Sequence, residues 1–303
     1  MLLVSDHPQH LVHKGGPTGP LLLLGGRTVK SRILRRNISN TIKIQKFMKY
    51  GLDYIKDAYE SCVLFFSYFQ ISGKYRGKCC RIIRASDYTT KDIYFVAGYI
   101  DYKAVEAFCS GTTGKVNILY QQSKVSGATN AIQATYNNMP IIYESGAFLS
   151  DGLKFVHTNL VDMSISSYTA ISNLTLYPVS IYSNNVITLD NNASYLFSIN
   201  SQLEYRVYLA TVSLRIADSS FAAINFTKNI THKSIFAWKD GGGVENYNAI
   251  DHNTASRYLS VSSGNIRLGS RNSATGYFYG NIKTLAIFNA DMYANYTELA
   301  ALI

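Results

Sequence analysis

Residues 76–123 constrain the fold of this 303-residue chain more than any other stretch, because strand, turn and helix signals follow one another there at short intervals. Cys80 and Ile82 alternate with Arg81 and Arg84, and this period of two predicts a strand with one apolar face. A charged turn follows, and then an apolar run at 93–100. Two extended segments joined by a turn are therefore expected before residue 101.

A short helix is expected next. Asp101 has a side chain suited to cap the amino terminus of a helix at Tyr102–Cys109. Gly111 and Gly114 end this helix, and residues 115–120 are expected to form a further strand.

An amphipathic helix is expected before this stretch, within residues 51–75. Apolar side chains recur there three and four positions apart, which is typical of a helix that packs on a core. The residues of this stripe are Tyr54, Ile55, Ala58, Tyr59, Cys62, Val63 and Phe66.

In the same order, these pieces resemble the N-terminal part of the arabinofuranosidase B catalytic domain, a concanavalin-like β-sandwich. The matching segments are 80–87, 92–95, 101–109, 120–123, 131–133 and 139–140. The resemblance implies the sandwich architecture. Gln121 stands where the family has an aspartate, and an amide cannot act as a carboxylate base or nucleophile, which argues against the family's activity. Similar domains occur in structural proteins of tailed phages and large DNA viruses, so activity has to be argued from the site.

From residue 146 onward, short apolar runs alternate with Asn, Ser and Gly, at the spacing typical of an all-β sandwich. The candidate strands are 153–157, 168–172, 194–199, 202–210, 213–216, 221–226, 233–239, 258–261 and 265–270. Residues 274–303 resemble the closing strands of laminin-G and concanavalin-like domains, followed by a short helix from about Met292. The predicted fold is therefore all-β: a concanavalin-like jelly-roll sandwich at 51–303 with a few short helices, preceded by an extended basic N-terminal arm at 1–50.

The arm carries most of the net charge of +10. Residues 1–50 contain nine Lys or Arg residues and one acid, Asp6, whereas the remainder is nearly neutral. Such an arm is either an interaction segment or a solvated leader without a partner. Basic residues are interleaved with apolar ones, which favours a protein groove over nucleic acid, since phosphate contacts need charge rather than burial. The predicted docking residues are Arg27, Lys30, Arg32, Ile33, Leu34, Arg35, Arg36, Ile38, Ile42 and Ile44.

Several kinds of site are not expected. The four cysteines, Cys62, Cys79, Cys80 and Cys109, include no C-x-x-C pair and the histidines are scattered, so neither a metal site nor a cofactor is predicted. Buried free thiols are expected, with a disulfide to Cys62 or Cys109 as the alternative. No apolar run approaches the roughly 18 residues of a membrane span. The first residues also lack the order of a secretion signal.

A Gly-rich loop is the candidate carbohydrate site. Asp240 and Glu245 flank it, Gly242 would let a sugar approach the backbone, and Trp238, the single tryptophan, could stack on a sugar ring. The alternative is a plain hairpin loop with Trp238 in the core. No catalytic residue is predicted.

Three functions follow from these features. The leading hypothesis is a non-enzymatic virion structural protein, of a capsid or tail, that docks on other virion proteins through the arm. The alternative is a carbohydrate-binding attachment module, and the third is an active arabinofuranosidase-like glycosidase.

Under the leading hypothesis, deletion of residues 1–45 is expected to abolish incorporation into virus particles, because burial of the arm's apolar residues would supply most of the docking free energy. Immunoblotting of purified particles would measure this. Incorporation of the truncated chain at the level of the full chain would contradict the hypothesis.

Overall fold

The computed structural model describes a β-rich unit between residues 51 and 299. The described residues are 51–55, 57–70, 72–124, 129–156, 159–166, 174–182, 194–199, 203–208, 211–216, 219–225, 231–238, 243–248, 251–256, 265–271, 276–290, 292, 295 and 298–299. For 174–182 and the strands within 203–256, the description covers the backbone. The chain divides into two units, Met1–Lys43 and Ile44–Ile303, and all described residues belong to the second.

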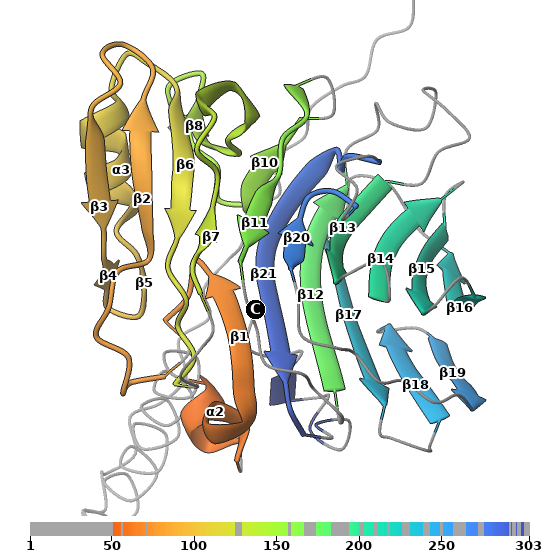
Figure 1. The fold of residues 1–303 in the computed structure, drawn as a ribbon. Coiled ribbons are helices and arrows are strands. Elements are labelled where there is room, and N and C mark those ends of the chain that lie inside the picture. Colours follow the sequence, from red (N-terminus) through yellow and green to blue (C-terminus); the bar gives the residue numbers. More distant parts are fainter. Residues whose placement is uncertain are drawn as a thin grey trace, which may run out of the picture. The chain divides into compact units, whose positions relative to one another are not determined.

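The first part of the unit contains the helices α2 and α3 (Figure 1). In order, the elements are a 3-10 helix (Gly51–Tyr54), α2 (Ala58–Ser61), β1 (Cys62–Ser67), β2 (Cys80–Arg84), β3 (Thr90–Ile93), β4 (Phe95–Val96), β5 (Tyr99–Ile100), α3 (Tyr102–Cys109), β6 (Gly114–Leu119), β7 (Ala131–Ile132), a 3-10 helix (Tyr136–Asn138), β8 (Ile141–Glu144), β9 (Ala147–Phe148), β10 (Leu153–Phe155) and β11 (Met163–Ile165).

The second part continues with β12 (Leu174–Tyr182), β13 (Ser194–Ile199), β14 (Leu203–Tyr208), β15 (Thr211–Ile216), β16 (Ser219–Asn225), β17 (Thr231–Trp238), β18 (Gly243–Asn248), β19 (Asp251–Ser256), β20 (Ile266–Leu268) and β21 (Gly280–Phe288). The ladders between these strands are antiparallel.

The sheet divides into two branches at β6, which pairs with both β8 and β7. One branch continues through β10, β21, β12, β17, β18 and β19. The other continues through β11, β20, β13, β14, β15 and β16. One buried cluster contains Ile282 and Leu285 from the first branch together with Met163, Phe197 and Leu268 from the second. The two branches therefore face each other across a shared core, which confirms the predicted all-β sandwich.

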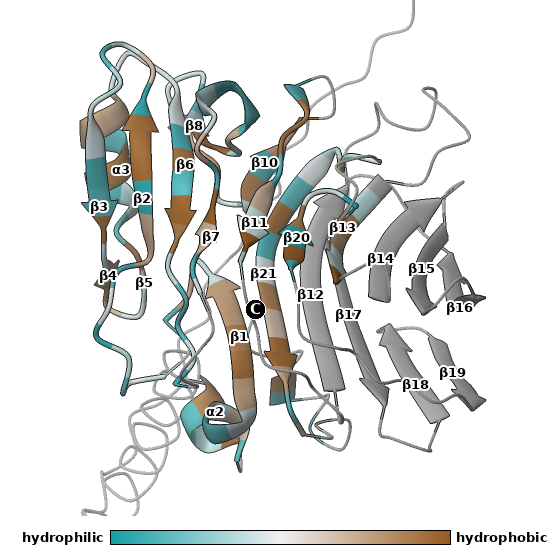
Figure 2. Cartoon of the chain, viewed as in Figure 1, coloured by the Kyte–Doolittle hydropathy of each residue, from teal (hydrophilic) through white to brown (hydrophobic). Residues whose placement is uncertain are grey.

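Strand β21 organises the first branch. One of its edges pairs with β12, and its other edge pairs with β1 at one end and with β10 at the other. Figure 2 shows apolar residues along both β1 and β21. Leu64 of β1 faces the main core, whereas Phe65 and Phe288 belong to a second buried cluster with the N-terminal helical turns.

Local signals place α3 as expected. The helix spans Tyr102–Cys109, and the Asp101 carboxylate accepts a hydrogen bond from the backbone N–H of Ala104 at 3.0 Å. The apolar run at 93–100 is divided, since Ala97 and Gly98 adopt φ angles of 53° and 89° and turn the chain between β4 and β5.

The expected helix over the stripe from Tyr54 to Phe66 is wrong. Helical structure is limited to a 3-10 turn and the four residues of α2, and β1 begins at Cys62. Asp57, with φ of 59°, separates the two turns. The run at 62–66 is buried on both faces of a strand, and such a short apolar run fits a buried strand as well as a helix.

Most later strands are confirmed within the described residues. The expected strands at 194–199, 202–210, 213–216, 221–226, 233–239 and 265–270 correspond to β13 to β17 and to β20. The expected strands at 168–172 and 258–261, the arm at 1–50 and most of the terminal helix lie outside the described residues. The proposed boundary at residue 50 therefore stays a prediction. No helix among the described residues is long and apolar enough to cross a membrane.

All four cysteines are buried free thiols, as predicted. Cys79 and Cys80 are both buried, although adjacent residues of a regular strand face opposite sides of a sheet. Cys79 precedes β2, and its thiol donates a hydrogen bond to the Ser67 carbonyl at 3.6 Å.

Candidate functional site

The predicted sugar-binding loop joins two paired strands. Trp238 of β17 is paired with Val244 of β18, and Glu245 is paired with Ala237. Asp240 and Gly242 lie outside the described residues, as does every predicted docking residue of the arm. The backbone thus has the predicted hairpin, and the roles of Trp238 and Glu245 stay predictions.

Gln121 fastens β1 to the sheet. Its side-chain oxygen accepts hydrogen bonds from the backbone N–H groups of Phe65, at 2.6 Å, and Gln122, at 3.0 Å. Its side-chain nitrogen donates to the Val63 carbonyl at 2.9 Å. The amide therefore acts as both donor and acceptor toward one strand, which an ionised aspartate cannot do. This structural role explains why a glutamine stands here.

Replacing Gln121 with alanine is expected to lower the free energy of unfolding by about 2–3 kcal/mol, because Phe65 and Val63 lose hydrogen-bond partners in a half-buried setting. Gln121→Glu should also destabilise, since a carboxylate cannot donate to the Val63 carbonyl. Urea unfolding measures both variants. Wild-type stability of Gln121→Glu would show that the donated hydrogen bond contributes nothing.

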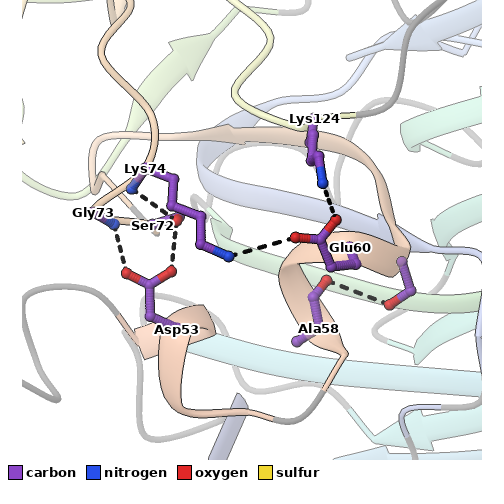
Figure 3. Close-up of polar contacts among 8 residues, drawn as sticks. Asp53, Ala58, Glu60, Ser72, Gly73, Lys74 and Lys124 are labelled. Carbon is purple, nitrogen blue, oxygen red and sulfur yellow. Dashed lines mark hydrogen bonds and ion pairs between the residues drawn. The ribbon is translucent and has the colours of Figure 1, made fainter.

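Two carboxylates near the N-terminal turns are engaged in hydrogen bonds and ion pairs (Figure 3). Asp53 accepts from the Ser72 hydroxyl at 2.6 Å and from the Gly73 N–H at 2.7 Å. Glu60 pairs with Lys74, at 3.4 Å, and with Lys124. These cations lower the pKa of the Glu60 carboxyl. Both groups line a hollow of about 260 Å³, but the Glu60 carboxylate, whose pKa is lowered by these cations, is poorly suited to donate a proton.

Three of the segments that resemble the arabinofuranosidase B domain meet at Asp92. The carboxylate accepts hydrogen bonds from Arg81 Nε at 2.8 Å, Lys78 Nζ at 2.7 Å and the Tyr120 hydroxyl at 2.8 Å. The Arg81 hydrogen bond is the main reason that the pKa of Asp92 lies well below its usual range. Arg81, Asp92 and Tyr120 thus join β2, β3 and the end of β6, so this part of the motif is architectural.

Because the pKa of Asp92 is lower in the folded chain than in the unfolded chain, its stabilising contribution is present above about pH 4 and is lost as the pH falls toward the folded value. We expect this contribution to be about 1 kcal/mol, since the carboxylate remains partly exposed to solvent. Between pH 6 and pH 2, urea unfolding should show a smaller fall in the free energy of unfolding for Asp92→Asn than for the wild type. Asp151→Asn, at an exposed turn, is the control. An identical dependence of the free energy of unfolding on pH for Asp92→Asn and the wild type would contradict the stabilising role of the ionised Asp92.

Asp162 is the most buried carboxylate described, with 4% of its surface exposed. One oxygen accepts from Gln133 Nε2 at 2.7 Å, and the other from Arg267 at 2.6 Å and the Ser270 hydroxyl at 2.9 Å. These residues lie in or beside β7, β11 and β20, so the cluster joins three strands of the second branch. With its lone pairs occupied in this way, Asp162 is also structural.

An aromatic cleft of about 510 Å³ lies elsewhere, between the β4–β5 hairpin, the amino end of α3 and β9. Its lining includes Phe69, Tyr99, Tyr102, Lys103, Phe148 and Lys283. Tyr99 and Tyr102 are 42% and 46% exposed. No prediction from the sequence covers this site, although the tyrosines on either side of Asp101, Tyr99 and Tyr102, were a signal for it. Within the described residues, no group of acidic, histidine or cysteine side chains is arranged to hold a metal ion.

A family model matches residues 55–146: the catalytic domain of α-L-arabinofuranosidase B. A comparison with curated proteins finds no match. Among solved structures, a GH54 α-L-arabinofuranosidase soaked with a cyclic sulfate inhibitor is similar over 81% of this chain, at 14% identity and a TM-score of 0.62. An arabinofuranosidase complexed with arabinofuranosyl-α-1,2-xylobiose is similar over 80% of this chain, at 16% identity and a TM-score of 0.52. The chain spans 63% and 62% of these two chains.

These matches correct one prediction. The expectation of a chain that is not an enzyme is contradicted, because the matching family model is a catalytic domain and the two solved structures described above are arabinofuranosidases. The matches do not test three predictions: that the chain belongs to a virion, that it docks on other virion proteins, and that nucleic acid is not its partner. These stay predictions. What is shown is the architecture: this chain has an arabinofuranosidase B-like β-sandwich, the fold of a carbohydrate-binding or glycosidase-like domain.

Proposed function

We propose that this chain is a glycosidase-type domain that binds glycans containing α-L-arabinofuranosyl residues and hydrolyses their glycosidic bond. The observation that carries the proposal is the match of residues 55–146 to the arabinofuranosidase B catalytic domain, in a chain with the same sandwich over 81% of its length.

The described carboxylates narrow the search for catalytic groups. Glycoside hydrolysis commonly uses two carboxyl groups about 5–9.5 Å apart, one of which must carry a proton. Asp53, Glu60, Asp92 and Asp162 are instead engaged by donors or cations of the sandwich. We therefore assign the catalytic pair to the acids between residues 190 and 291, namely Asp190, Glu204, Asp218, Asp240, Glu245, Asp251 and Asp291.

The test is turnover of 4-nitrophenyl α-L-arabinofuranoside by the full chain. Single Asp→Asn and Glu→Gln changes at those seven positions should include two that reduce kcat at least about 100-fold, because loss of an acid, base or nucleophile removes a reacting group. Asp92→Asn is the matched control, since it removes a structural carboxylate. A folded chain that does not turn over the substrate, or activity that survives all seven changes, would overturn the proposal.

A further inference from the structure

The aromatic cleft is preformed rather than an incidental gap between loops. The Phe69 and Tyr99 rings meet edge-on at 5.2 Å, and the Tyr102 and Phe148 rings lie 6.2 Å apart. Phe148 also packs on Tyr68, at 5.4 Å. Each exposed ring is thus held by a neighbouring ring, so a ligand would not have to order the wall as it binds.

The backbone of the wall is equally fixed. The Ile100 N–H donates to the Tyr68 carbonyl at 2.8 Å, and the Gln70 N–H donates to the Gly98 carbonyl at 2.8 Å. Ala97, which lines the cleft, has a φ of 53°, an unfavourable angle for a residue with a side chain. Backbone strain of this kind is often found at ligand sites.

The charges of the cleft are unbalanced. Lys103 and Lys283 line it, and neither forms an ion pair with any residue that the structure describes. Lys283 Nζ lies 5.2 Å from the centre of the Phe69 ring, which places its charge beside the aromatic wall. Asp101 is the acid of the lining, and its carboxylate already accepts the capping hydrogen bond of α3. The cleft therefore offers aromatic faces and an excess of one positive charge.

We propose that this cleft binds a saccharide that carries a carboxylate, that is, a uronic acid residue of a glycan. The C–H face of a sugar ring packs on Tyr99 and Tyr102, and the carboxylate pairs with Lys283 and Lys103. The volume of about 510 Å³ lies within the range of small-ligand sites. The assignment rests on the proposed function for its choice of a sugar, and it adds an acidic subsite formed by residues other than the seven candidate catalytic acids.

The test compares two probes by isothermal titration calorimetry with the full chain: xylotriose carrying one glucuronic acid, and plain xylotriose. The acidic probe should bind at least about tenfold more tightly at low salt, and the difference should shrink at 0.5 M NaCl. Lys283→Gln should bring the affinity for the acidic probe close to that for the neutral one. Tyr102→Ala should weaken binding of both probes about tenfold, because a stacked ring is lost.

Two controls separate the cleft from the rest of the fold. Tyr88→Ala removes a tyrosine that is 64% exposed and packs on Tyr136, outside the cleft, and Lys91→Gln removes an exposed cation near Phe108. Neither variant should change the affinity for the acidic probe or for the neutral probe. Equal binding of the two probes, or wild-type binding by both Lys283→Gln and Tyr102→Ala, would overturn the proposal.

The outcome for the cleft is distinguishable from that for catalysis. Turnover of 4-nitrophenyl α-L-arabinofuranoside is measured separately from binding, and Tyr88→Ala and Lys91→Gln, which lie outside the cleft, should keep the wild-type rate. Selective binding of the acidic probe without turnover would contradict the proposed hydrolysis but support the proposed ligand of the cleft. Turnover without selective binding of the acidic probe would contradict only the proposed ligand of the cleft.

Discussion

Replacing Asp162 with alanine is expected to lower the free energy of unfolding by about 3 kcal/mol, the lower end of the cost of breaking a buried charge pair, because the Arg267 side chain is 30% exposed. The variant leaves Arg267 without its carboxylate, and the Ser270 and Gln133 side chains lose the acceptor that they share. Urea unfolding should show a lower midpoint with an unchanged slope, because the exposed surface of the unfolded chain is the same.

Two further variants define the origin of this effect. Asp162→Asn keeps an acceptor oxygen but removes the charge, so its free energy of unfolding should lie between those of the wild type and Asp162→Ala. Asp87→Ala breaks an ion pair with Arg84 at the surface, where Asp87 is 41% exposed, and should change the midpoint little. Equal effects of Asp162→Ala and Asp87→Ala would mean that burial adds nothing to the Asp162 cluster.

The second large effect is expected at Gly152. This glycine has a φ of +116°, and a Cβ atom there would lie 2.6 Å from the carbonyl carbon and oxygen of Ile282 and 2.7 Å from the N atom of Lys283. The obstacle is the backbone of β21, which also pairs with β1 and β12 and cannot shift alone. Gly152→Ala should therefore cost about 3 kcal/mol or more, from backbone strain together with overpacking.

Gly146→Ala is the matched control for this prediction. Gly146 has a φ of +82°, but nothing lies within 4 Å of the position that its Cβ would take. That variant should lose only about 1 kcal/mol, the cost of the left-handed conformation for a residue with a side chain. Thermal and urea unfolding of both variants would compare them directly. Equal losses would show that β21 tolerates the added methyl group.

Signals that act over a few residues were sufficient for part of the fold. Asp101 and Gly111, which has a φ of 75°, fix the ends of α3, and these devices operate within one or two helical turns. The alternation at Cys80–Arg84 likewise describes one face of a strand. Segments of this kind could be placed from the sequence because their own residues decide their conformation.

Other features depend on partners that the local pattern does not contain. The run at 62–66 forms a strand because β21 pairs with it and because cores lie on both of its faces. Gln121 looked like a lost catalytic carboxylate, but the direction of its side chain depends on where β1 lies. The cleft brings Lys283 beside Tyr102, and only the folded sheet places them together.

The pairing of β1 with β21 has a consequence for how the chain reaches its fold. Ser67 and Thr284 share a hydrogen bond although they are 217 positions apart. During synthesis from the amino terminus, the apolar residues of β1 must wait for the closing strand before they can be covered on that edge. A ladder between such distant segments slows folding, since a long loop has to close first. Chaperone demand and aggregation in the cell should therefore depend on how soon β21 leaves the ribosome.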